Sequence, residues 1–112
     1  MQMTLDFPLT FDPSWGYYHK GWKAYERNIR LKYGIKHGWW SMDAVDFEAE
    51  GFTTLEKIWD VDDYNERHEV ILNGTRAVDV WMAFSKLMEL TEDYHHSFLE
   101  GLSEDGRVWA GS

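Results

Sequence analysis

Cysteine is absent from the 112-residue sequence, which excludes disulfide bonds, thiolate catalysis, cysteine-ligated zinc and iron–sulfur clusters. No apolar run approaches the roughly 20 residues that are needed to span a bilayer. The first ten residues combine neither a basic start nor a long apolar stretch, so we do not expect a signal peptide. These absences together predict a cytoplasmic protein that does not contact a membrane.

Proline is scarce as well, with two residues, both near the start of the chain. No repeat, low-complexity tract or linker divides the sequence, which predicts a single compact domain over residues 1–112. Aromatic residues, by contrast, make up 17% of the chain, a share that is untypical of disordered proteins. Such side chains fill cores and anchor interfaces, and composition does not separate the two uses.

Hydrophobic periodicity predicts the first elements. Residues 5–11 alternate apolar and polar side chains, which indicates a strand or extended arm, at an edge because of Pro8. A helix is predicted from an N-cap at Ser14 to a stop at Gly34. Its apolar face is formed by residues spaced three and four apart, namely Trp15, Tyr18, Trp22, Tyr25 and Ile29.

The middle of the chain is read from shorter patterns. Residues 45–49 alternate and predict a strand with one acidic face, although a short helix after Ser41 is an alternative. Thr53 and Glu56 have the spacing of a capping box, which predicts a short helix through Trp59. An exposed acidic loop over residues 60–66 and a strand over residues 68–72 are expected to follow.

The last third predicts a second long helix and a hairpin. Thr75 is expected to cap a helix that ends near Leu90, with an apolar face of Val78, Trp81, Phe84, Leu87 and Met88. Residues 95–102 and 107–110 flank a polar loop that ends in glycine, which indicates a β-hairpin, with a helix over 92–100 as the alternative. The predicted class is therefore α+β, with two main helices packed on a small, mostly antiparallel sheet.

Charge is distributed unevenly along the chain, whose net charge is −9. Residues 14–37 hold six basic residues against one acidic residue, whereas residues 38–112 hold five basic against seventeen acidic residues. An acidic surface of this kind presents the negative field that a nucleic-acid-binding protein expects from phosphates. The candidate partner-binding residues are Asp43, Asp46, Glu48, Glu50, Asp60, Asp62, Asp63 and Glu66, with Trp39 or Trp40 as a buried anchor.

We therefore expect a non-enzymatic protein-binding module, an inhibitor that occupies a basic, nucleic-acid-binding surface of another protein. In size and charge the chain resembles the broad class of small phage-encoded inhibitors that includes anti-restriction and anti-CRISPR proteins, and the likeness is one of composition, not of motif. That class implies a location in the host cytoplasm. The alternative for the charged segments is internal pairing, because charge runs are usually solvated faces.

Three other functions compete with this hypothesis. A small metal-dependent or acid–base hydrolase would use His68, His95 and His96, but no HExxH motif or other ligand spacing is present, and we predict neither metal nor cofactor. Direct nucleic-acid binding would use the basic stripe of helix 14–34, formed by Lys20, Lys23, Arg27 and Arg30, against repulsion from the rest of the chain. A homo-oligomer would use the surplus of aromatic residues as its interface.

Overall fold

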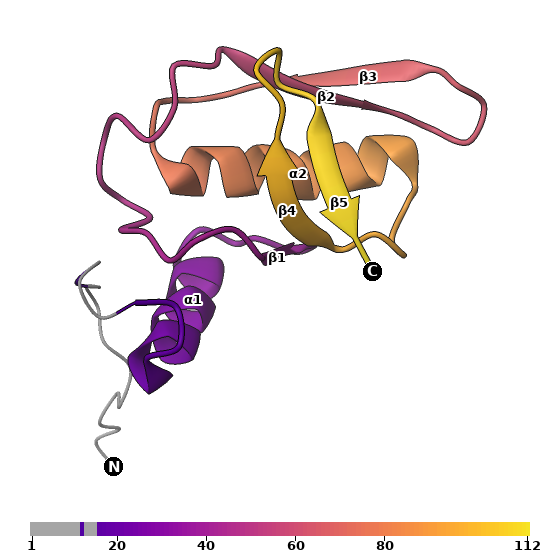
Figure 1. The fold of residues 1–112 in the computed structure, drawn as a ribbon. Helices are drawn as coiled ribbons and strands as arrows, with labels where there is room; N and C mark the ends of the chain where they lie inside the picture. The colour runs from indigo at the N-terminus through magenta and orange to yellow at the C-terminus, as the bar shows by residue number, and fades with distance from the viewer. Residues whose placement is uncertain (1–11, 13–15) are drawn as a thin grey trace.

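The computed structural model describes residue 12 and residues 16–112. Within these residues the predicted α+β class is confirmed, with two helices and two small, mostly antiparallel sheets (Figure 1). The predicted strand over residues 5–11, together with Ser14 and Trp15, lies outside the described residues. In chain order the elements are α1 (Lys20–Lys32), β1 (Trp39–Trp40), β2 (Lys57–Val61), β3 (Arg67–Ile71), α2 (Ala77–Thr91), β4 (Phe98–Leu102) and β5 (Val108–Gly111).

The strands form two sheets that meet at one point. In the first sheet β4 lies between β1, which is parallel to it, and β5, which is antiparallel. In the second, β2 and β3 form an antiparallel hairpin. A parallel bridge between Trp59 and Arg107, and a hydrogen bond of 3.0 Å from the Trp59 N–H to the Gly106 carbonyl, join the two sheets. We call this junction the seam.

One cluster of buried side chains holds the helices and both sheets together. It includes Trp22 of α1, Trp81 of α2, Ile58 of β2 and Leu99 of β4, all fully buried. Large aromatic and aliphatic side chains of this kind each contribute roughly 1.5–3 kcal/mol when they leave water. The aromatic surplus of the sequence is divided between this core and the surface, because several described aromatic side chains, Tyr18, Tyr64 and Trp109 among them, are exposed.

The second long helix matches its prediction closely. All five residues of its predicted apolar face are buried, and α2 ends at Thr91 instead of Leu90. Its N-cap is Arg76 and not Thr75, because the Asp79 carboxylate accepts the Arg76 backbone N–H at 3.0 Å and also binds the guanidinium. The Arg76 hydrogen bond holds the pKa of Asp79 below its usual range.

The first helix begins later than predicted. Its N-cap is His19, whose Nδ1 accepts the Gly21 N–H at 2.9 Å, and Gly16 has a left-handed backbone (φ 79°) that a helix from residue 14 would not allow. Tyr18 was expected on the buried face but is 98% exposed, so that assignment is wrong. Trp22, Tyr25 and Ile29 of the face are buried as predicted, and Gly34 (φ 63°) ends the helix.

Two predictions for the middle of the chain are wrong. Residues 45–49 form a loop, not a strand, and that loop inserts Phe47 into the core. Residues 57–61 form strand β2, not a helix, because β3 and Gly106 supply partners for its backbone. The Thr53 hydroxyl accepts the Leu55 N–H at 3.0 Å in an extended segment, so the apparent capping box begins no helix.

The hairpin predictions are confirmed. The strand expected over residues 68–72 is β3, shifted by one residue. Strands β4 and β5 pair antiparallel around the loop at residues 103–106, so the helix alternative for 92–100 is wrong. In the part of the chain that the structure describes, no helix has both the length and the hydrophobicity to cross a membrane.

Candidate acidic binding site

The turn between β2 and β3 is organised by one carboxylate. Asp62 Oδ1 accepts the backbone N–H groups of Tyr64 and Glu66, each at 2.9 Å, and Asp62 Oδ2 lies 2.8 Å from His68 Nε2. Asn65 adopts the left-handed conformation (φ 62°) that this short turn requires, and asparagine tolerates it well. The His68 hydrogen bond, helped by the backbone N–H groups, keeps the pKa of Asp62 below its usual range.

A second carboxylate is held in the same way in the loop between α2 and β4. Asp93 Oδ1 accepts the backbone N–H groups of His95 and His96, at 3.1 and 3.2 Å, and Oδ2 lies 2.7 Å from His96 Nδ1. Burial favours the neutral acid, but hydrogen bonds from His96 and His95 outweigh burial and lower the pKa of Asp93. Asp62 and Asp93 are therefore anchored negative charges.

These two turns face a common hollow of about 510 Å³ that lies across the seam. We call it the acidic hollow, and its charged and aromatic lining consists of Asp60, Asp62, Asp63, Asp93, His96, Arg107 and Trp109. Two segments of the chain, the end of β2 with its turn and the loop after α2, thus bring four carboxylates to one place, and β5 adds Trp109. Trp109 on the wall is 63% exposed.

The cation in the acidic hollow is Arg107, and it does not balance the carboxylates. Arg107 Nε lies 3.6 Å from Asp60 Oδ1, in a pair whose side chains are both partly exposed. Its guanidinium also lies 5.1 Å from the centre of the Trp59 ring. Exposed ion pairs of this length contribute little, so the hollow keeps a net negative charge that attracts cations.

The other predicted acidic residues lie elsewhere. Asp43, Asp46, Glu48 and Glu50 belong to the loop after β1, at the opposite end of the molecule from the β2–β3 turn (Figure 1). Two of them serve the fold: Asp46 accepts the Tyr25 hydroxyl, and Glu48 pairs with Lys32. The structure therefore divides the predicted acidic surface, and it gathers Asp60, Asp62 and Asp63 into the hollow. Glu66 is exposed in the β2–β3 turn and does not line the hollow.

The two predicted tryptophan anchors point in opposite directions from β1. Trp40 is buried in the core, where its Nε1 donates to the Asp43 carbonyl at 3.1 Å. Trp39 is 38% exposed and has the Arg30 guanidinium 4.1 Å from its ring centre. Neither lines the acidic hollow, where Trp109 takes the place of an aromatic anchor.

The basic stripe of α1 is partly used inside the molecule. Arg30 donates to the Gly38 and Lys36 carbonyls and so holds the loop that follows the helix. Partial burial lowers the pKa of Arg30, as expected for a cation with reduced access to water. Lys20, Lys23 and Arg27 are exposed on the helix surface.

Among the described residues, the group with metal-ligand geometry contains His68 but neither His95 nor His96. His68 pairs with Asp62 and His96 pairs with Asp93, while His95 is exposed. The described residues with metal-ligand geometry are Asp62, Glu66 and His68, whose donor atoms lie within 4.8 Å of one another. Both Asp62 oxygens already accept protein hydrogen bonds, so this group has a structural use in the turn.

Sequence reasoning missed Asp93 and Trp109. The signal for Trp109 was available, because it follows the apolar Val108 in a predicted strand, and alternation places neighbouring side chains on opposite faces. Comparison with known protein families, curated proteins and solved structures gives no match, so the function has to be inferred from the site itself.

Proposed function

We propose that the protein is a binding module whose acidic hollow receives a basic segment of another protein, and that it inhibits a nucleic-acid-binding protein by occupying its basic surface. The observation that carries this proposal is the convergence of Asp60, Asp62, Asp63 and Asp93 beside the exposed Trp109. Carboxylates pair with lysine and, in forked geometry, with arginine. Tryptophan beside them is the side chain most often found to dominate interface energies.

Electrostatics supports a basic partner in particular. The net charge of −9 speeds the approach of a cationic surface, and the local field of the acidic hollow orients it. Because the pKa values of Asp62 and Asp93 are lowered, these two groups stay ionised below the usual carboxylate range. The hollow therefore keeps these two negative charges at neutral pH.

The test compares two triple variants that remove the same charge. In one, Asp60, Asp62 and Asp63 become Asn; in the other, Asp43→Asn, Glu50→Gln and Glu56→Gln remove three exposed carboxylates outside the hollow. Binding to an immobilised nona-arginine peptide is measured by surface plasmon resonance over a salt series. We expect the first variant to associate more slowly and to lose most of its salt dependence, and the second to resemble the natural chain.

Equal losses in both variants would show that only net charge matters and would refute the site. Trp109→Ala is expected to increase the dissociation rate with little effect on association, because it removes contact area and not charge. The inhibitory role is tested separately, with a partner recovered from bacterial lysate at low salt. Binding of that partner to its nucleic acid should fall as this protein is added, and unchanged binding would refute inhibition.

A further inference from the structure

Strand β3 is an outer edge of the joined sheets. Among the described residues its one strand neighbour is β2, which the seam links to β5, so the strands run β1-β4-β5-β2-β3 across this part of the molecule. The other outer strand, β1, has only two residues. An edge strand presents unpaired backbone donors and acceptors, which form a template for another strand. β3 is the longer template of the two.

The hydrogen bonds at the two ends of the β2–β3 hairpin show which residues of β3 direct their backbone groups towards β2. The Leu72 N–H donates to the Glu56 carbonyl at 2.9 Å, and the Asp62 N–H donates to the Glu66 carbonyl at 2.9 Å. Both belong to hydrogen-bonded pairs, and such pairs alternate along an antiparallel ladder. Residues 66, 68, 70 and 72 therefore direct their backbone groups towards β2.

The intervening residues direct their backbone groups away from the sheet. These residues are Arg67, Glu69 and Ile71, and no hydrogen bond from another described residue reaches their backbone N–H or C=O groups. Ile71 is 76% exposed, which is unusual for a large apolar side chain in a strand. We call this row the outer edge of β3.

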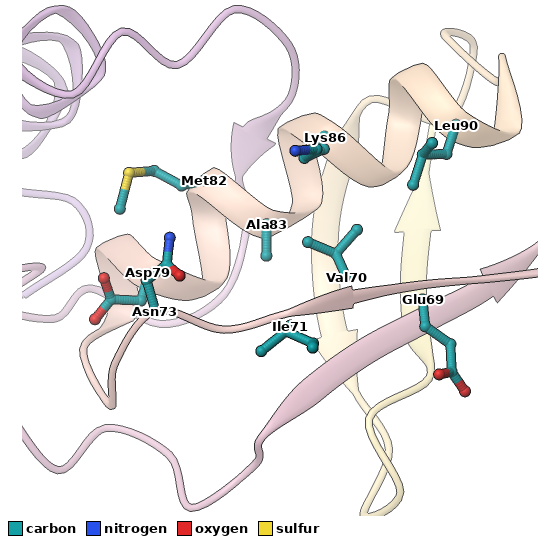
Figure 2. A pocket seen from close by; sticks show the side chains of 9 residues that line it. All are labelled: Glu69, Val70, Ile71, Asn73, Asp79, Met82, Ala83, Lys86 and Leu90. Carbon is teal, nitrogen blue, oxygen red and sulfur yellow. The ribbon is translucent and has the colours of Figure 1, made fainter.

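A hollow of about 470 Å³ runs along the outer edge, between β3 and α2. Figure 2 shows Met82, Ala83, Lys86 and Leu90 of α2 on one side and Val70 and Ile71 of β3 on the other. A strand added at the outer edge would lay its inward side chains over this mainly apolar lining. The hollow thus offers space and an apolar lining for one additional strand beside β3.

The side chains at the outer edge are mainly basic, whereas the chain as a whole is acidic. Lys57 and Arg67 both pair with Glu69, at 3.1 and 2.8 Å, and Lys86 is exposed on the adjoining helix. Three basic residues against one acidic residue make this side locally positive, on a chain whose net charge is −9. Two copies that approach through their outer edges therefore avoid the repulsion between carboxylates that contact through the acidic hollows would bring.

We propose that two copies of the protein pair through β3, antiparallel about a two-fold axis. A two-fold axis places identical outer edges face to face, so each outward N–H meets an outward C=O of the partner. The pairing would cover Ile71 and extend the sheets through two copies. This interface uses backbone groups and aliphatic side chains, and so differs from the aromatic homo-oligomer interface that the composition suggests.

The first test measures molar mass by light scattering over a concentration series, with a variant that blocks only the outer edge. Glu69→Pro removes one outward N–H and leaves the ladder to β2 intact, since proline is tolerated where the N–H faces away from the sheet. The mass is expected to be twice 13.3 kDa for the natural chain and 13.3 kDa for the variant. Glu69→Gln, which removes the ion pairs but keeps the N–H, should remain a dimer.

The second test exploits the absence of cysteine, because a single introduced cysteine can form only intermolecular disulfides. Glu69→Cys or Val70→Cys, whichever lies on the axis, should cross-link rapidly under mild oxidation, and the exposed Lys36→Cys should not. A natural chain that stays monomeric at every concentration, or a dimer that survives Glu69→Pro, overturns the proposal. These variants leave the carboxylates of the acidic hollow unchanged, so the proposed function is tested independently.

Discussion

Phe47 belongs to a loop, yet its side chain is fully buried. Its ring lies 5.1 Å from the rings of Trp22, Trp40 and Trp81 and 5.3 Å from that of Tyr25. Aromatic pairs at such separations contribute beyond the area that they bury. A single loop residue thus connects α1, β1 and α2.

Phe47→Ala is expected to lower the free energy of unfolding by about 3–5 kcal/mol, because it leaves a cavity among four rings that cannot close over it. Chemical denaturation monitored by circular dichroism would measure the loss. Phe52→Ala, at a residue that is 37% exposed, is the matched control and should cost clearly less. Similar losses at the two positions would contradict the role given to Phe47.

Glu26 is a buried acid on α1, and burial raises its pKa above the usual value. The folded protein therefore disfavours the ionised form, and this penalty is present above the raised pKa. It disappears as the pH falls through the raised pKa towards the ordinary one, where the folded state takes up a proton.

Glu26→Gln should therefore have a higher melting temperature than the natural chain at pH 7, and the difference should shrink near about pH 4. Thermal melts at the two pH values would measure it. Glu104→Gln, at an exposed position, controls for the loss of one negative charge. A lower melting temperature of Glu26→Gln at pH 7 would mean that Lys23 and Arg30 compensate the buried charge fully.

At the scale of elements, the seam depends on a glycine. Gly106 has φ 92°, and a Cβ atom there would lie 2.5 Å from the Lys57 carbonyl oxygen. Its own carbonyl accepts the Trp59 N–H. A residue with no side chain is thus required both by the backbone conformation of the β4–β5 turn and by the close approach of β2.

Gly106→Ala is expected to destabilise the protein by more than Gly51→Ala does. Gly51 also has a positive φ, 84°, but nothing lies within 4 Å of an added Cβ, so this control carries only the conformational cost of about 1–2 kcal/mol. Gly106→Ala adds a backbone clash at the seam. Equal free energies of unfolding for the two variants would show that the seam relaxes without loss.

At the scale of the whole molecule, basic charge concentrates in α1, whereas acidic charge lies at both ends. Basic α1 lies at one end, and the acidic turn between β2 and β3 lies at the other (Figure 1). Internal pairs such as Lys32 with Glu48 use part of the basic charge, and most of the acidic excess stays unbalanced. Repulsion among like charges then opposes folding.

Sodium chloride should therefore raise the melting temperature over the range from low to physiological ionic strength, because screening weakens this repulsion. Differential scanning calorimetry in a salt series would show the trend. Repeating the series in sodium sulfate at matched ionic strength separates screening from effects on the hydrophobic core. A melting temperature that falls with salt would mean that the exposed ion pairs outweigh the repulsion.

The same scale explains which features the sequence could predict. Helix α2 and the β4–β5 hairpin depend on neighbouring residues, and both were predicted with small boundary errors. The conformation of residues 45–61 depends on residues that are distant in the sequence. Phe47 packs against aromatic rings from both helices, and β2 is held as a strand by β3 and Gly106. The acidic run at residues 60–63 was visible, but its meeting with Asp93 and Trp109 requires the fold.

The seam has a consequence for the motion of the molecule. Asp60, Asp62 and Asp63 lie on its β2 side and Trp109 on its β5 side, so the acidic hollow exists only while the two sheets stay together. A ligand that contacts both walls holds the two sheets together. Its binding free energy is added to the free energy that is needed to separate them. The Trp59 N–H donates across the seam to Gly106, so its amide hydrogen exchange should slow as the affinity of the ligand increases.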